Sequence, residues 1–368
     1  MADNVVEVRG VGLAYSELAP GAAGVPAAAR AGAAADALAG AGAGAHGTFV
    51  LVHGLGSSRH IWDLVAPTLA TRFRVLALDQ RGHGESDKPD DGYDFPSIVA
   101  DLFGFLERLA PAQPVVLVGH SWGASVVLHV AVQHPERIAG LVLVDGGTSS
   151  PGERSTWDET LERLTPPDID GMRWADLRRR MSARNGMYED PRVEAVGRSL
   201  FNFDADGRIY RRLKIPNHLR ILRALWEQRP AELLPQVRAP LLLLPARQSA
   251  DAGDWSDAKA RSIQRALELQ PRARLRWFED TVHDIPLHRP DELAAELVAF
   301  ADSSFSGAAT PTPDSTAATL LDAAPAHPDG TASTVVGAAA AGPDGTASTV
   351  VGAAAAGPDG TASTVVGA

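Results

Sequence analysis

The sequence predicts an α/β protein in which a mostly parallel, doubly wound sheet carries a helical insertion. Continuous apolar runs of strand length, such as residues 48–52 and 140–144, alternate along the chain with segments whose apolar residues have helical spacing. Such runs are typical of strands that are buried on both faces of a parallel sheet. One stretch, residues 146–234, lacks strand-like runs and is rich in Arg, Asp and Glu. This stretch therefore predicts a helical cap.

The first part of the chain begins with two short strands and then changes composition. Residues 5–8 and 12–18 have the pattern of a hairpin, whereas residues 19–47 are nearly all Ala and Gly. We interpret residues 19–47 as a flexible surface insertion, because such small side chains form flexible linkers and cannot build a core. Further strands are expected at residues 48–52, 74–79, 115–119 and 140–145, with helices between them.

The remaining segments complete the domain organisation. After the cap, a strand is expected at residues 240–244, another at residues 273–278 and a closing helix at residues 290–300. Residues 1–145 and 235–300 thus form the two parts of the core. The low-complexity tail, residues 301–368, contains 15-residue repeats that begin at Pro328, Pro343 and Pro358. Each repeat is too small and too polar to stack into a core, so the tail is predicted to be disordered.

Composition excludes several functional classes. The formal net charge of the 368 residues is −11, and the tail contributes six aspartates and no Lys or Arg. This acidic balance gives no support to nucleic-acid binding. With no cysteine in the chain, disulfides, thiolate nucleophiles and Cys-based metal sites are excluded, and the scattered histidines predict no metal or other cofactor. No segment resembles a signal peptide or a membrane helix, so a cytoplasmic protein with a small-molecule substrate is expected.

The sequence Gly119-His120-Ser121-Trp122-Gly123 matches the G-x-S-x-G pattern of a nucleophile elbow. A serine at a sharp strand-to-helix turn has a strained backbone, so the residues two positions to either side must be nearly free of side chains. The hydroxyl is then held above the sheet, beside the free N–H groups at the start of the next helix. A strand-like run precedes the motif and an apolar helical segment follows it, which is the context that the motif requires. Ser121 is therefore the candidate nucleophile.

A serine hydroxyl needs a base within hydrogen-bond reach, and histidine is the side chain best suited to that task at neutral pH. Among the eleven histidines, His283 follows the last expected strand and precedes the last helix. This position places it at the carboxyl edge of the sheet, beside Ser121. His53 and His83 lie in glycine-rich loops, where we expect them to shape the backbone. His283 is therefore the candidate general base.

At this point the chain resembles the α/β-hydrolase superfamily, and in particular its small capped members. The resemblance is carried by His53-Gly54, the loop at residues 79–86 (Asp-Gln-Arg-Gly-His-Gly-Glu-Ser), the elbow at residues 119–123 and the histidine loop at residues 282–287. It covers residues 5–300 and implies that the elbow follows the fifth strand and the cap follows the sixth. It also implies an oxyanion hole formed by two backbone N–H groups, those of Leu55 and Trp122.

The acid of the triad is the point where the sequence departs from the family pattern. The usual position after the strand at residues 240–244 falls on Ser249, and Asp251 lies two residues beyond it. Other family members place the acid at the end of the sixth strand, which here is Asp145. We favour Asp145 and keep Asp251 as the alternative. Asp254 and Asp284 are weaker candidates.

These residues predict acyl transfer to Ser121, followed by hydrolysis through water that His283 activates. A serine at the elbow argues against the dehalogenase and epoxide-hydrolase branches of the superfamily, which attack with a carboxylate. The expected substrate is an ester or a lactone with an apolar acyl part. Two alternatives remain open: a C–C bond or amide hydrolase on the same fold, and a non-catalytic ligand-binding protein that retains the triad.

Overall fold

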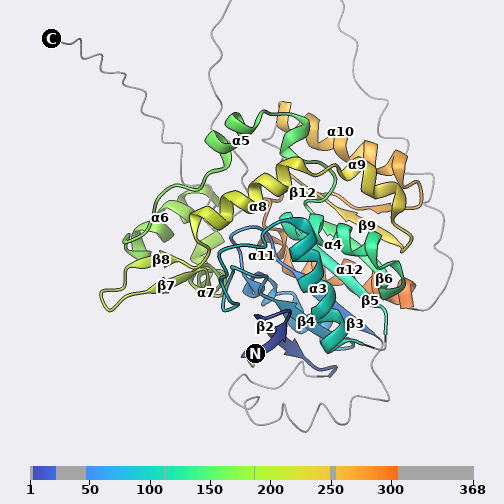
Figure 1. Cartoon of the computed structure of the whole chain (residues 1–368), viewed down its shortest axis with the longest axis horizontal. Coiled ribbons are helices and arrows are strands. Elements are labelled where there is room, and N and C mark those ends of the chain that lie inside the picture. The colour runs from blue at the N-terminus through green and yellow to red at the C-terminus, as the bar shows by residue number, and fades with distance from the viewer. Residues whose placement is uncertain (1–2, 22–46, 112, 186, 249–253, 306–368) are drawn as a thin grey trace, which may run out of the picture.

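The central sheet positions every element of the candidate site. The computed structural model describes residues 3–21, 47–111, 113–185, 187–248 and 254–305. Within these ranges, eight strands form one sheet in the order β1-β2-β4-β3-β5-β6-β9-β11 (Figure 1). The strands of the sheet are β1 (Asp3–Val8), β2 (Val11–Leu18), β3 (Thr48–Val52), β4 (Arg74–Leu78), β5 (Val115–His120), β6 (Ile138–Val144), β9 (Leu241–Leu244) and β11 (Arg274–Leu275).

All strand pairs from β4 to β11 are parallel, whereas β2 is antiparallel to both β1 and β4. The mostly parallel, doubly wound sheet predicted from the sequence is therefore confirmed. Consecutive parallel strands are joined through helices, which cover both faces. The helices of the core are α2 (Ala66–Leu69), α3 (Phe95–Leu109), α4 (Trp122–Gln133), α10 (Asp254–Leu269), α11 (Ile285–His288) and α12 (Pro290–Phe305).

The strands in the middle of the sheet are buried on both faces, which explains their continuous apolar sequence. In β3, every residue is buried. Phe49 and Leu51 join a cluster with side chains of α2 and α12, while Val50 and Val52 join a second cluster with side chains of α3 and α4. The twofold alternation of side chains thus divides one apolar strand between two cores.

Between β6 and β9 the chain forms the cap, which is not purely helical. Its helices are α5 (Trp157–Leu164), α6 (Trp174–Asn185), α7 (Pro191–Ser199), α8 (Ile215–Glu227) and α9 (Pro230–Leu233). An antiparallel hairpin of β7 (Phe201–Phe203) and β8 (Ile209–Arg211) lies among them, at the same end of the molecule as α6 and α7 (Figure 1). The expectation of an insertion without strands is therefore wrong. The turn is formed by Asp204, whose carboxylate accepts N–H groups of Asp206 and Arg208.

The predicted strand at residues 273–278 is interrupted. Only β11 joins the large sheet, and β12 (Phe278–Glu279) pairs with β10 (Ala246–Arg247) in a separate two-stranded sheet. This small sheet begins just after β9 and ends just before the histidine loop. It therefore connects the two segments in which a triad acid and the triad base were expected.

The closing helix extends further than the sequence predicts. Ala301 is fully buried, and the ring of Phe305 stacks on Phe73 with 6.2 Å between ring centroids. The tail therefore does not begin at Ala301, because α12 continues to pack against the core for five more residues. Residues 22–46 of the predicted insertion and residues 306–368 of the predicted tail lie outside the described residues. None of the described helices combines the length and the hydropathy that crossing a bilayer requires.

Candidate active site

Ser121 occupies the sharp turn between β5 and α4. Its φ of 56° and ψ of −121° lie in a sparsely populated region for a residue with a side chain. A Cβ on Gly119 would lie 2.3 Å from the carbonyl oxygen of Gly123, and a Cβ on Gly123 would lie 2.5 Å from that of His53. Close packing of the backbone around the turn therefore requires both glycines of the motif. The turn places Ser121 at the start of α4, where the first N–H groups have no acceptor within the helix.

The loops that follow β3 and β6 both pack against this serine. A Cβ on Gly54 would lie 2.9 Å from the Cβ of Ser121 and 3.3 Å from its Oγ. On the other side, a Cβ on Gly146 would lie 2.2 Å from the carbonyl oxygen of Ser121. The Ser121 N–H donates to the carbonyl of Val144 at 2.9 Å. The carboxyl ends of three neighbouring strands thus meet at this side chain.

His283 lies between β12 and α11 and faces Asp145, the residue after β6. Nδ1 of His283 and Oδ2 of Asp145 are 2.5 Å apart, and the carboxylate is the acceptor. Nε2 of His283 is buried and has no hydrogen-bond partner among the described residues. An imidazole held in this tautomer presents a lone pair at Nε2, which is what a general base needs. The structure therefore brings together the two residues that the sequence favours as base and acid.

The carboxylate of Asp145 is enclosed by hydrogen-bond donors. It accepts the N–H of Ala246 at 2.9 Å, and Nζ of Lys259 lies 3.0 and 3.1 Å from its two oxygens. Burial alone would raise the pKa of Asp145, but the Lys259 ammonium, the His283 imidazole and the Ala246 N–H together lower this pKa well below its ordinary value of 3.8. Asp145 therefore stays ionised and can hold the Nδ1–H of His283 at neutral pH.

Lys259 is a residue of the site that sequence reasoning missed. It lies on α10, its side chain is about three-quarters buried, and Nζ also donates to the carbonyl oxygen of Ala246 at 3.0 Å. It thus ties Asp145 to the segment that follows β9. No local pattern singles out this lysine in a charged helix, because its role depends on how α10 packs over the ends of β6 and β9.

His120, the second residue of the elbow motif, supports the histidine loop. Its Nε2–H donates to the carbonyl oxygen of His283 at 3.0 Å, and the centroids of the two imidazole rings lie 4.8 Å apart. Burial, together with the neighbouring His283, lowers the pKa of His120 to about 3, so the ring is neutral. The elbow motif itself marks this position, since the residue before the nucleophile must point away from the reacting side of the turn.

Of the other candidate acids, only Asp284 has a side chain that the structure describes. Asp251 lies outside the described residues, and Asp254 begins α10. Asp284 is the N-cap residue of α11, and burial raises the pKa of its carboxyl. Among the described residues, only Asp145 places a carboxylate within hydrogen-bond distance of His283. No three His, Asp or Glu side chains in the described part of the chain are grouped as they would be around a metal ion.

Leu55 and Trp122, the expected oxyanion donors, are chain neighbours of two residues that meet at the elbow, Gly54 and Ser121. Leu55 follows Gly54, and Trp122 is the first residue of α4. The ring of Trp122 stacks on His83, with 5.4 Å between ring centroids, and Nε2 of His83 accepts the N–H of Gly56 at 3.1 Å. His83 therefore connects the loop after β3 with the start of α4.

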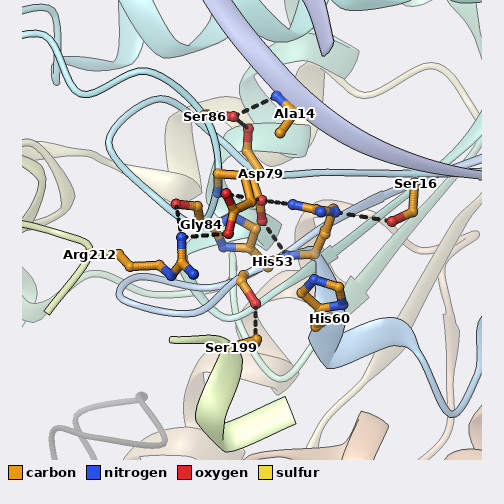
Figure 2. Close-up of polar contacts among 12 residues, drawn as sticks. Ala14, Ser16, His53, His60, Asp79, Gly84, Ser86, Ser199 and Arg212 are labelled. Atoms are coloured by element: carbon orange, nitrogen blue, oxygen red, sulfur yellow. Dashed lines mark hydrogen bonds and ion pairs between the residues drawn. The ribbon is translucent and has the colours of Figure 1, made fainter. Parts of the chain in front are cut away.

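A buried ion pair holds the loops after β3 and β4 in place. The carboxylate of Asp79 accepts the backbone N–H of Arg59 at 2.7 Å and that of Glu85 at 2.9 Å, and it pairs with the Arg59 guanidinium. Nε of Arg59 donates to Oγ of Ser16 at 3.0 Å. Figure 2 shows Asp79 at the centre of these contacts, beside His53. Because the network is buried and largely satisfied, it gives the loop that contains Leu55 a rigid base.

Comparison with known proteins identifies the family. A model described as the alpha/beta hydrolase family matches residues 49–296. The chain belongs to the α/β hydrolase family. This assignment confirms the fold and the superfamily that the motifs predict, and it places the chain among hydrolases.

Individual relatives within the α/β hydrolases differ in the activities for which they are named. A haloalkane dehalogenase of Mesorhizobium japonicum is 32% identical over 262 residues, which cover 69% of this chain and 75% of that protein. Epoxide hydrolase B of Mycobacterium tuberculosis is 38% identical over 130 residues, or 32% of this chain and 36% of that protein. The crystal structure of E-2-(acetamidomethylene)succinate hydrolase matches with a TM-score of 0.63 at 19% identity, covering 82% of this chain and 99% of that one. That structural likeness shows the fold.

Proposed function

We propose that this α/β hydrolase is a serine hydrolase that cleaves an ester or a lactone of a small molecule through an acyl-enzyme intermediate. Ser121 is the nucleophile, His283 the general base and Asp145 the acid. The N–H groups of Leu55 and Trp122 form the oxyanion hole.

The pairing of His283 with Asp145 is the observation that carries this proposal. The Asp145 carboxylate holds Nδ1 of His283 at 2.5 Å, while Nε2 is buried and has no hydrogen-bond partner among the described residues. Leaving a buried nitrogen without a partner costs stability, so packing alone does not explain this arrangement. The loop of His283 is attached to the elbow through His120. Asp145 is followed directly by Gly146, which packs on the backbone of Ser121. The geometry thus supports a triad in which the lone pair on Nε2 serves the Ser121 hydroxyl.

The proposed mechanism follows from these positions. Nε2 of His283 accepts the proton of the Ser121 hydroxyl as Oγ attacks the carbonyl carbon of the substrate, and Asp145 stabilises the resulting imidazolium. The imidazolium then protonates the leaving oxygen, which leaves an ester between Ser121 and the acyl group. In the second half-reaction, His283 takes a proton from water as its oxygen attacks the acyl carbon. The imidazolium then protonates Oγ of Ser121 as the acid leaves, which restores the free enzyme.

The oxyanion hole stabilises the negative charge that develops on the carbonyl oxygen in both half-reactions. Trp122 supplies an N–H from the free start of α4, and Leu55 supplies one from the loop that contacts the Ser121 side chain. By comparison with donors removed from other enzymes, each N–H contributes about 3 kcal/mol to transition-state stabilisation. Because both donors are backbone groups, the rigid loop anchored by Asp79 matters more than the identity of the Leu55 side chain.

The residue at the elbow favours acyl transfer over the activities named for two of the relatives. Haloalkane dehalogenases and epoxide hydrolases attack a carbon atom with an aspartate carboxylate, whereas this chain has Ser121 at that position. A serine attacks a carbonyl carbon well and an alkyl halide poorly, since a hydroxyl lacks the charge of a carboxylate. An amide or C–C bond hydrolase uses the same triad and is the alternative that a substrate panel distinguishes.

Labelling with a fluorophosphonate tests the nucleophile directly. Intact-mass measurement on the wild type should show one adduct, and the adduct should be absent in Ser121→Ala. In His283→Ala, the rate of labelling should fall by at least about a thousandfold, because the base is lost. The Ser304→Ala variant, which changes a partly buried serine of α12, is the control and should label like the wild type. A folded wild-type protein that forms no adduct would contradict the proposal and favour a ligand-binding role.

A further inference from the structure

A pocket with basic lining lies between the cap and the loop after β3. It is lined by Gly56 from that loop and by cap residues, of which Arg211, Arg212 and His218 are basic. The other lining residues form an apolar wall: Pro166, Leu200, Phe201, Leu213 and Ile215. Burial and the nearby Arg211 lower the pKa of His218 to about 4, so this ring is neutral at pH 7. The positive charge in the pocket therefore comes from the two arginines.

The two arginines differ in how their charges are balanced. Arg212 pairs with the Glu85 carboxylate at 2.5 Å and also donates to the carbonyl of Gly84 at 3.4 Å (Figure 2). Arg211 donates from Nη2 to the carbonyl oxygen of Pro167, and within the described ranges no carboxylate lies at ion-pair distance from its guanidinium. Burial lowers the pKa of Arg211, and the nearby Asp170 and Asp168 carboxylates partly oppose this shift. A guanidinium has five N–H donors. Arg211 can therefore donate to a bound anion without displacing a protein carboxylate.

The pocket is close to the candidate nucleophile. Gly56 lines the pocket, while Gly54, two residues before it, packs against the Ser121 side chain. Two residues of chain span at most about 7 Å. A second connection runs through His83, which stacks on Trp122 and accepts the N–H of Gly56. The pocket and the Ser121 side chain therefore both lie against the short loop that follows β3.

On the basis of the proposed function, we infer that this pocket is a carboxylate subsite and that the enzyme acts on esters that carry a carboxylate at the far end of a short apolar chain. The guanidinium of Arg211 binds the carboxylate, and the apolar wall contacts the methylene groups. The scissile carbonyl then lies at Ser121. A carboxylate suits the pocket better than a larger anion, because planar oxygens match the fork of an arginine at one side of an apolar wall.

Matched pairs of esters test the subsite. The monoethyl esters of succinate, glutarate and adipate are compared with neutral analogues in which the terminal carboxylate is a carboxamide. Hydrolysis is followed by titrating the released acid. For the best chain length, kcat/KM of the wild type should favour the carboxylate about ten- to a hundredfold, as expected for a charge-assisted hydrogen bond. In Arg211→Gln this preference should disappear through a rise in KM, and in Arg211→Lys it should fall to an intermediate value.

Arg208→Gln is the control for the loss of a positive charge. Arg208 lies just before β8 on the same hairpin and is exposed, but it does not line the pocket. The Arg208→Gln variant should retain the preference of the wild type. Equal kcat/KM for the charged and neutral esters in the wild type would overturn the inference, and so would an unchanged preference in Arg211→Gln.

A binding measurement separates this inference from the proposed function. Calorimetry on Ser121→Ala should detect binding of adipate or glutarate, and the added Arg211→Gln substitution should abolish it. If no ester is hydrolysed and no fluorophosphonate adduct forms, but the dicarboxylate binds through Arg211, the hydrolase proposal fails and the subsite stands. If neutral esters are hydrolysed and no dicarboxylate binds, the subsite fails and the hydrolase stands.

Discussion

The carboxylate of Asp145 interacts with two basic side chains: it accepts a hydrogen bond from His283 and forms an ion pair with Lys259. Replacing Asp145 by Asn keeps the shape but allows the amide to donate toward Nδ1, which favours the wrong tautomer of His283. We expect kcat to fall about ten-thousandfold, as in other triads that lose the charge of the acid. Steady-state hydrolysis of an ester substrate measures this loss.

The matched variant for this experiment is Asp284→Asn, which changes a buried carboxyl that makes no hydrogen bond to His283. It should retain kcat to within about tenfold, because it leaves the tautomer of His283 unchanged. A variant Asp145→Asn with nearly normal kcat, together with an inactive Asp251→Asn, would show instead that the acid follows β9.

Lys259 offers a second prediction at the residue scale, a loss of stability whose size depends on pH. Asp145 has a folded-state pKa below its ordinary value of 3.8, so its ionisation stabilises the fold above that value and the effect is lost as pH falls through the folded pKa. Lys259→Met removes the main favourable charge, so the pKa of Asp145 should rise. At pH 7 we expect a loss of about 1–3 kcal/mol in the free energy of unfolding, less than for a fully buried pair, because Lys259 is partly exposed.

As the pH falls below 4, the difference between the wild type and Lys259→Met should shrink. Asp145 becomes protonated first in the unfolded chains and in the folded variant, and in the folded wild type only at lower pH, where its lowered pKa lies. Urea unfolding at several pH values measures this trend. Lys88→Met controls for the loss of a partly buried lysine that donates to the carbonyl oxygens of Gly84 and Ser86 and forms no ion pair within the described residues. A destabilisation by Lys259→Met that does not change with pH would contradict the proposed electrostatic role.

The positions of those candidate-site residues that lie in local motifs could be predicted from the sequence. Ser121 is marked by its flanking glycines, and His283 by its position between the last strand and the last helix. The acid stayed ambiguous because Asp145 and Asp251 both follow strands that the sequence predicts. The structure shows Asp145 facing the imidazole, whereas Asp251 lies outside the described residues. Lys259 could not be predicted, because it is 114 residues from its partner Asp145.

At the scale of elements, the loop between β4 and α3 depends on a glycine that packs against a buried charge. Gly84 has a φ of 45°, and a Cβ there would lie 2.1 Å from the carboxylate of Asp79. Gly84→Ala should cost about 3 kcal/mol or more of unfolding free energy, because backbone strain adds to a clash with a buried ion pair. Thermal and urea unfolding measure the cost.

Gly207→Ala is the matched control, since this glycine has a φ of 72° but nothing within 4 Å of its Cβ position. It should cost only the strain of the left-handed conformation, about 1 kcal/mol. Equal costs at Gly84 and Gly207 would mean that the loop after β4 can move away from Asp79, and that the Asp79 network is less rigid than its hydrogen bonds indicate.

Secondary structure could be predicted where a pattern repeats over several residues. The parallel strands are apolar throughout because both faces are covered, so β3, β5 and β6 are evident in the sequence. The hairpin of β7 and β8 was missed because each strand has only three residues, which is too short for alternation to stand out among charged neighbours. Its Asp-Ala-Asp-Gly turn is the signal that was available.

At the scale of the whole molecule, the boundary of the folded core is a testable result. The sequence suggests that order ends at residue 300, because the segment that follows is composed mainly of small residues. In the structure, Ala301 is buried, Asp302 pairs with Arg72, and Phe305 stacks on Phe73. Composition could not show this, since a few residues at the end of a helix bury area only through partners that are distant in sequence.

Two truncations that differ by five residues separate these interpretations. Removal of residues 306–368 should leave the midpoint of thermal unfolding and the kcat for an ester unchanged, as expected if the low-complexity repeats form no core. Removal of residues 301–368 should cost about 2 kcal/mol, mainly from the apolar area of Phe305 and Ala301, because the pair between Arg72 and Asp302 is half-exposed and contributes little. The point variant Phe305→Ala in the full chain should reproduce most of that loss. If removing residues 306–368 alone lowers the unfolding midpoint by several degrees, the repeats must pack on the α/β core, and the prediction of a disordered tail is wrong.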